Sequence, residues 1–437
     1  MQIIVAGIGC GYHIEPLRKL LPKATIFLYE PIDDIRKLIA EETYCRPNNE
    51  NITIIHSKTE LDHLIQNAKQ PLKLFIHPWY RRNFPDMEAR ILDSITNSGK
   101  ILDVAGIERF FRLWSGNFFK LLQKDSIRFL AGKHPSQKEN FHTLLYCGAG
   151  PGLLSDLERL KTFSNHFMDS VFLVASDTAL APLIHAGYTP DIVISVDSGP
   201  GTPYHFAAAD RLSSNSVKEK KIAQFPFPVI SWSAGPSSLE SYFQNIYYYR
   251  STLPFDQILG EGPLAQIPEW INLSRNTMGI ALLLAAEAKI STVYAAGADF
   301  TSRKGDSHVR GSGYTLFAMQ NISRCNTIEM YRPGGYTEKL SGKNRLILDE
   351  VQKMADINKI RLRFLSADDL DETDSLQIAD SRKTKLTDLF KIKSIETKEL
   401  RQFLSGIWEK INFSEFGSEI SVEQRLKWKR LLKSGSF

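Results

Sequence analysis

The sequence predicts an α/β protein with three parts: an N-terminal Rossmann-like domain, a central Rossmann-like and doubly wound domain, and a small C-terminal helical region. Short β-rich runs alternate with segments of helical spacing, which is typical of a mostly parallel sheet covered by helices. Two of these runs end in glycine-rich turns that lead into a helix, at residues 7–11 and 148–152. The last stretch of the chain has the spacing of amphipathic helices.

The N-terminal domain is expected over residues 1–105. The run at residues 2–6 is followed by glycines at positions 7, 9 and 11, and the next predicted strand, at residues 24–29, ends at Glu30. An acidic residue about 20 positions after a glycine turn commonly binds a ribose hydroxyl. The pattern allows a dinucleotide or S-adenosylmethionine site, or a glycine turn kept for packing alone.

A helical linker is expected at residues 106–140, the central domain at 141–370 and a basic helical region at 371–437. Within the last region, helical spacing covers residues 386–408 and 421–432. A further strand is expected at 361–366. The other candidate strands of the central domain are Leu144–Cys147, Val171–Ala175, Ile192–Val196, Val229–Ser233, Tyr247–Tyr249 and Thr292–Ala296.

Composition and charge narrow the class of protein. The four cysteines have no metal-like spacing, which favours a reducing, cytoplasmic setting without disulfides. We expect neither a leader nor a membrane span, because Met1 leads directly into a strand and no apolar run is long enough. Residues 381–437 carry 13 Lys and Arg against 7 Asp and Glu, so the body is nearly neutral and nucleic acid is not an expected partner.

Three strand ends of the central domain carry residues suited to a ligand. The first strand ends in the turn Gly148, Ala149, Gly150, Pro151 and Gly152, whose backbone N–H groups precede a helix and could bind phosphate. The next strands end in Ser176, Asp177 and Thr178, and in Asp197 and Ser198. Because the carboxyl ends of parallel strands share one edge of a sheet, we expect a nucleotide site there.

Two later segments are expected at the same edge. Asn276 and Thr277 precede a long apolar helix, and either would be a good N-cap. Asp299 follows the strand at residues 292–296, and the polar segment 301–314 after it reads as a mobile active-site loop.

The chain resembles the motility-associated-factor (Maf) flagellin glycosyltransferases, whose central domain is shared with an archaeal pterin pyrophosphokinase. The matching pieces are CGAGPGL at 147–153, ASDTALAPLIHAGYTPDIVISVD at 175–197 and AGADFTSRKGDSHVRG at 296–311. The N-terminal IIVAGIGCGYHIEPL, FLYEPIDDI and FIHPWYRRNFPD also fit that family, so the resemblance covers about residues 1–365.

The resemblance implies a sialyltransferase-like central fold. It also implies transfer of a pseudaminic or legionaminic nonulosonic acid from a CMP-activated donor to Ser or Thr hydroxyls of flagellin. The bacterial sialyltransferase turn GxGPS lies against CMP. Here Gly148, Gly150 and Pro151 match it, and Gly152 replaces the usual serine.

Such a transfer needs a stabilised leaving phosphate and a base for the acceptor hydroxyl. His308 is the candidate base and Asp306 could orient it, while Arg310 or Lys304 could meet the donor carboxylate. Asp177 would bind cytosine or ribose, or cap a helix. No cofactor is required by the pattern; Mg²⁺ is the one candidate, with Asp197 and Asp299 as its carboxylates.

Three other functions stay open at this point. The first is a Mg²⁺-dependent pyrophosphokinase acting with ATP, which would use Asp177, Asp197 and Asp299. The second is a flagellin-binding protein without catalysis. The third is a methyltransferase centred on the turn at residues 7–11 and Glu30.

Overall fold

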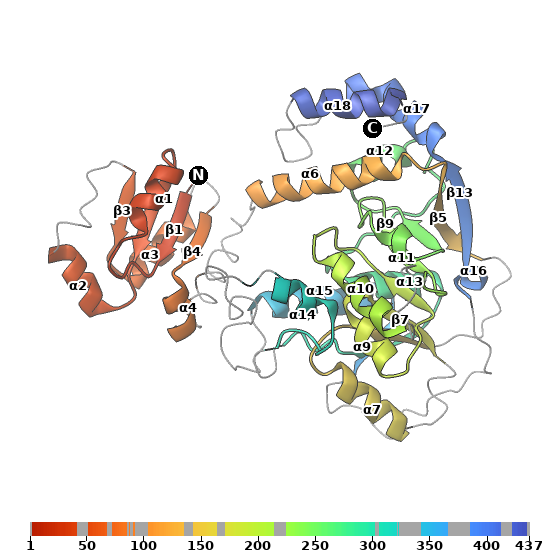
Figure 1. Cartoon of the computed structure of the whole chain (residues 1–437), viewed down its shortest axis with the longest axis horizontal. Coiled ribbons are helices and arrows are strands. Elements are labelled where there is room, and N and C mark those ends of the chain that lie inside the picture. Colours follow the sequence, from red (N-terminus) through yellow and green to blue (C-terminus); the bar gives the residue numbers. More distant parts are fainter. Residues whose placement is uncertain are drawn as a thin grey trace. The chain divides into compact units, whose positions relative to one another are not determined.

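The computed structural model describes residues 2–41, 51–67, 72–84, 104–134, 143–163, 171–213, 224–301, 306–320, 342–365, 385–411 and 422–434, together with Met87, Ile91 and Ile322. The chain forms two compact units, each with its own sheet (Figure 1). Unit 1 comprises Met1–Arg109 and Ser341–Lys343, and unit 2 comprises Phe110–Leu340 and Asn344–Phe437.

In the described ranges of unit 1, four parallel strands form a sheet in the order β3 (Ile52–Ile55), β2 (Thr25–Tyr29), β1 (Gln2–Ala6) and β4 (Leu72–Ile76). Alternating side chains of these strands contribute to two separate apolar clusters, as expected for a sheet buried on both faces. The helices are α1 (Ile14–Leu20), α2 (Asp33–Glu41), α3 (Lys58–Asn67) and α4 (Pro78–Asn83).

Among the residues that the structure describes, the sheet of unit 2 has nine strands, of which only β13, at one edge, is antiparallel to its neighbour. In spatial order the strands are β12 (Arg361–Phe364), β11 (Thr292–Ala296), β6 (Thr143–Cys147), β7 (Phe172–Ser176), β8 (Ile192–Ile194), β9 (Val229–Trp232), β10 (Ile246–Tyr249), β5 (Ser126–Lys133) and β13 (Phe390–Glu396).

Helices fill the connections between these strands. The helices nearest the site are α7 (Leu153–Phe163), α9 (Leu180–His185), α10 (Thr202–Ser213), α13 (Thr277–Glu287) and α14 (Gly313–Gln320). The others are α6 (Val104–Leu121), α11 (Leu239–Tyr242), α12 (Pro254–Gly260), α15 (Gly342–Ile357), α16 (Leu386–Leu389), α17 (Thr397–Ile407) and α18 (Val422–Ser434). Helix α13 is apolar on all sides and packs into the core, which explains its nearly continuous hydrophobic sequence.

The predicted α/β class is confirmed, and the predicted strands of the central domain are present. Two expectations about its flanks need correction. The segment predicted as a helical linker contains β5, and the segment predicted as a helix at residues 386–408 contains β13 between two helices. With eight and seven residues, they are longer than the other strands that the structure describes in this sheet; β13 forms its edge, and β5 lies between β10 and β13. Helix α6 precedes β5, and α16 and α17 flank β13, so helical spacing dominates the local pattern around both strands.

The C-terminal helices belong to the same core as the sheet. Helices α17 and α18 lie together at one end of unit 2 (Figure 1). Trp428 of α18 is buried and stacks on Phe119 of α6, with ring centroids 5.1 Å apart. The boundaries expected near residues 140 and 370 lie outside the described residues.

Candidate functional site

The strand order of unit 2 places a topological switch point between β6 and β11. From β6 the chain proceeds outward through β7, β8, β9 and β10, and it returns to the other side of β6 as β11. In open α/β sheets, ligands bind outside the carboxyl ends of the strands at such a point. The glycine turn after β6 and Asp299 after β11 are therefore at the expected place.

The glycine turn joins these two strands through its own backbone. Gly148 N–H donates to the Ala296 carbonyl (2.8 Å) and Gly150 N–H to the Gly297 carbonyl (2.7 Å). A Cβ on either Gly148 or Gly150 would lie 2.6 Å from the Gly297 oxygen, so only glycine allows this approach. Two of the backbone donors predicted to bind CMP are thus already bonded within the protein.

Asp299 accounts for a third donor of the turn. Its Oδ2 accepts a hydrogen bond from Gly152 N–H (2.9 Å), just before α7 begins at Leu153. Ala149 lies in the same turn, and its carbonyl accepts from Val309 N–H (2.8 Å), while Pro151 has no N–H to donate. The turn holds β6, β11 and the segment before α14 together, and its role in phosphate binding stays a prediction.

A buried carboxylate lies at the end of β7. Asp177 is 4% exposed; its Oδ1 accepts from Thr178 N–H (2.7 Å) and Thr178 Oγ1 (3.1 Å), and its Oδ2 accepts from Ser195 Oγ (2.7 Å). The predicted alternative, a helix cap, is filled by Ser176 instead, whose Oγ accepts from Ala179 N–H. Asp177 is therefore not the helix cap, and its carboxylate instead orients the hydroxyls of Thr178 and Ser195.

The start of α13 lies beside Tyr146 of β6, which in turn lies near Asp177. Asn276 is the N-cap, as predicted, because its Oδ1 accepts from Gly279 N–H (2.9 Å). The Thr277 hydroxyl is 2.7 Å from that of Tyr146 on β6. Burial raises the pKa of Tyr146, and the charge of Asp177 adds to this. The buried Tyr146 hydroxyl therefore connects the start of α13 with the end of β7.

His205, in α10, was not anticipated from the sequence. Its Nε2 lies 3.3 Å from Thr178 Oγ1, and the residue is 9% exposed. Burial lowers the pKa of His205, although the charges of Asp177 and Asp197 act in the opposite direction. The signal available in the sequence was a histidine in the first turn of the helix that follows the Asp197 strand end.

His308 lies close enough to His205 for their charges to interact. Burial, followed by the effect of His205, lowers the pKa of His308 from its ordinary 6.5 to about 4. The ring stacks on Tyr314, with centroids 4.4 Å apart, and its Nδ1 is 2.8 Å from Ser307 Oγ. His308 is therefore neutral at pH 7, which leaves its lone pair available as an acceptor.

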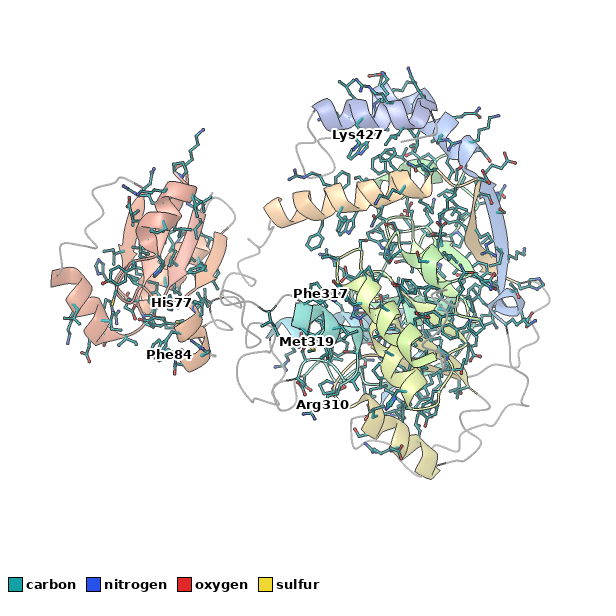
Figure 2. The ribbon with its side chains drawn as sticks, in the orientation of Figure 1. His77, Phe84, Arg310, Phe317, Met319 and Lys427 are labelled. Carbon is teal, nitrogen blue, oxygen red and sulfur yellow. The ribbon has the colours of Figure 1, made fainter. Side chains whose placement is uncertain are left out.

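Asp306 does not orient His308. Its Oδ2 instead accepts from Arg310 Nε at 3.2 Å, in an ion pair on the surface. Arg310 is 86% exposed in its side chain (Figure 2), so it does not point into the buried group of residues. Within the part of the chain that the structure describes, His308 has a hydrogen bond with the hydroxyl of Ser307. Lys304, the other candidate for the donor carboxylate, lies outside the described residues.

Asp197 and Ser198 lie at the end of β8. Asp197 is exposed, and its Oδ1 accepts from Gly199 N–H (2.8 Å). Ser198 is buried and donates to the Ala234 carbonyl (2.5 Å), so it supports the neighbouring turn after β9. Within the described ranges, no three His, Cys, Asp or Glu side chains come close enough to hold a metal ion. A Mg²⁺ ion held by Asp197 and Asp299 together with substrate phosphates stays a prediction.

The glycine loop of unit 1 is held by a carboxylate of its own. Glu30 is fully buried, and its Oε2 accepts from Ile8 N–H (2.8 Å), Gly9 N–H (3.1 Å) and the Tyr80 hydroxyl (2.8 Å). Its Oε1 accepts from Ile32 N–H (3.0 Å). Glu30 bonds the loop instead of facing a ribose, which favours the packing interpretation over the methyltransferase.

The comparison with protein families matches a part of unit 2. The family model described as "6-hydroxymethylpterin diphosphokinase MptE-like" matches residues 115–305. This range includes the glycine turn, Asp177, His205 and Asp299, and it ends before His308. No curated protein matches the chain.

Among solved structures, the chain is similar to a MAf glycosyltransferase from Magnetospirillum magneticum AMB-1. The two are 15% identical with a TM-score of 0.46, and the comparison covers 99% of this chain and 69% of the other. Among the helices that the structure describes, none has the length and apolar character to cross a membrane.

Proposed function

We propose that the chain is a glycosyltransferase that moves a pseudaminic- or legionaminic-type nonulosonic acid from a CMP-activated donor to Ser or Thr hydroxyls of flagellin. One observation carries the proposal. The three central segments that resemble the Maf family, residues 147–153, 175–197 and 296–311, lie at the carboxyl ends of β6, β7, β8 and β11. Segments far apart in sequence thus meet at the switch point where a donor would bind.

The chemistry of this edge supports a transfer to a hydroxyl. In such a reaction the acceptor oxygen bonds to the anomeric carbon, and the bond from that carbon to the phosphate oxygen breaks. CMP leaves with the electron pair, and a base takes the acceptor proton. Two buried histidines with lowered pKa values, His205 and His308, are neutral at pH 7 and so can accept a proton.

A diphosphokinase is the second candidate, because the MptE-like family model covers most of the site. That reaction depends on Mg²⁺ bridging the phosphates of ATP, held by carboxylates. Asp177 is already bonded to three donors, and Asp299 bonds the turn before α7. Two of the three carboxylates of this edge are thus engaged in holding the protein, and Asp197 alone is exposed, which favours the glycosyltransferase.

The deciding experiment offers both sets of substrates to the purified chain. With a CMP-activated nonulosonic acid and flagellin, we expect intact mass spectrometry to show flagellin heavier by one or more sugar residues, together with free CMP. With ATP, Mg²⁺ and 6-hydroxymethylpterin, we expect no AMP. Formation of AMP and a pterin diphosphate would instead establish the diphosphokinase, and flagellin binding without a mass change would support a non-catalytic partner.

A further inference from the structure

We infer that His205 is the base of the proposed transfer, and that Asp177 and Thr178 set its Nδ1 as the atom that accepts the proton. The inference rests on the proposed function for the identity of the substrate. It depends otherwise on hydrogen bonds at the ends of β7 and α10.

The tautomer of His205 follows from the Thr178 hydroxyl. A threonine hydroxyl has one hydrogen to donate, and an ionised carboxylate can only accept. Thr178 Oγ1 donates to Asp177 Oδ1 at 3.1 Å, so toward His205 Nε2, 3.3 Å away, it can only accept. Nε2 must then carry the hydrogen. In a neutral imidazole this leaves Nδ1 with a lone pair.

The Asp177 carboxylate is well held for this purpose. Besides Thr178, the Ser195 hydroxyl donates to its other oxygen at 2.7 Å. Both oxygens are therefore occupied by donors, and the carboxylate has a fixed orientation. The hydrogen bonds connect the Asp177 carboxylate to the Thr178 hydroxyl and this hydroxyl to the His205 imidazole. In other active sites, too, a third group orients the base through such bonds.

Nδ1 of His205 is the end of this chain of hydrogen bonds. It is shielded from solvent and has no hydrogen-bond partner among the residues that the structure describes. A buried acceptor without a partner costs free energy, so it is uncommon unless function requires it. A hydroxyl of an acceptor would complete this hydrogen bond and then lose its proton to Nδ1.

The groups around His205 are compatible with a single added proton. Asp177 and Asp197 face it with negative charge, and, among the residues that the structure describes, His308 is a titratable group whose pKa His205 affects. The effect of His205 on the pKa of His308 keeps His308 neutral when His205 is charged. His308 is also bonded to Ser307 through its Nδ1 and stacked on Tyr314, which suits a supporting position.

The first test compares two substitutions at one position. His205→Gln can keep a polar contact to Thr178, and His205→Asn places an amide near the position of Nδ1. Neither amide can act as a base. We expect both to lower the rate of transfer to flagellin by roughly 10²- to 10⁴-fold, with CMP affinity changed by less than about threefold. The exposed His185 of α9 supplies a control, His185→Gln, with unchanged transfer. Transfer within about threefold of wild type in His205→Gln would overturn the inference.

A second test needs no variant to remain active. Nitrogen-15 NMR of histidine-labelled wild-type protein distinguishes the two neutral tautomers, and His205→Gln identifies the signal. We expect His205 to carry its hydrogen on Nε2, and Thr178→Val to weaken this preference and reduce transfer by about tenfold. A hydrogen on Nδ1 would refute the inference even if transfer occurs. Absence of transfer by the wild type would instead count against the proposed function.

Discussion

The two sheets of this protein carry similar glycine turns that are held in the same way. In unit 1 the carboxylate of Glu30, at the end of β2, accepts hydrogen bonds from Ile8 and Gly9 in the loop after β1. In unit 2 the carboxylate of Asp299, after β11, accepts from Gly152 in the turn after β6. In both units a carboxylate of the protein accepts from backbone N–H groups of the kind that bind phosphate at other glycine turns.

The units differ in what lies beside the turn. In unit 1, Glu30 and Tyr80 bond each other and close the group of polar side chains. In unit 2, a separate set of hydrogen bonds at the end of β7 joins Asp177, Thr178 and His205, and it ends at an acceptor atom. A glycine turn before a helix is thus weak evidence for a ligand, and the neighbouring strand ends decide whether a site exists.

The largest effect is expected from Gly150→Ala. The added Cβ would lie 2.6 Å from the Gly297 oxygen and also contact the Asp299 carboxylate, so β6 and β11 must move apart. We expect urea unfolding to show a loss of roughly 3 kcal/mol or more in the stability of unit 2. Gly116→Ala in α6 is the control, because its Cβ would meet no atom within 4 Å. If Gly150→Ala were as stable as wild type, the turn would not hold β6 and β11 in a fixed position.

A smaller effect is expected from acid. Because the pKa of His308 is 6.5 when unfolded and about 4 when folded, the unfolded state binds more protons below pH 6.5. His308 therefore contributes stability that is fully present above pH 6.5 and is lost as the pH falls toward 4. We expect urea unfolding to give a free energy of unfolding that is lower at pH 4.5 than at pH 7.5, with His308 contributing up to roughly 3 kcal/mol of the difference.

The matched control for the acid effect is His308→Gln, which cannot titrate. Its stability should fall less than that of wild type between the same two pH values, and the lowered pKa of His205 should account for part of the remaining loss. If wild type and variant lose the same free energy on acidification, His308 does not hold a lowered pKa in the folded protein.

The smallest effect is expected in unit 1, from Glu30→Gln. The amide offers one acceptor oxygen where the carboxylate accepts four hydrogen bonds, so the loop after β1 should be destabilised by about 2 kcal/mol. Faster hydrogen exchange of the backbone amides of Ile8 and Gly9 in the variant would measure this loss of stability. Tyr80→Phe, which removes one of these four bonds, should cost less. Unchanged exchange together with S-adenosylmethionine binding would restore the methyltransferase hypothesis.

The sequence predicted which strand ends contribute residues to the site, but it did not predict which of these residues bond each other. Residues 148–152, Asp177 and Asp299 were found because small and acidic residues follow strands, and parallel strands end at one edge. Their bonding was not predictable: Asp299 bonds Gly152, and Asp306 pairs with Arg310 instead of orienting His308. These partners are distant in sequence or equivalent in local pattern, so spacing alone does not select between them.

The sequence by itself determined the α/β class, the central strands and the N-cap at Asn276, because alternation, helical spacing and capping act over a few residues. Only the tertiary structure decided that β5 and β13 extend the sheet beyond β10, since each depends on a strand distant in sequence to supply its hydrogen bonds. It also decided the environment of His205. The burial of that residue between strand ends and helices, which no local pattern encodes, leaves Nδ1 as an acceptor without a partner among the described residues.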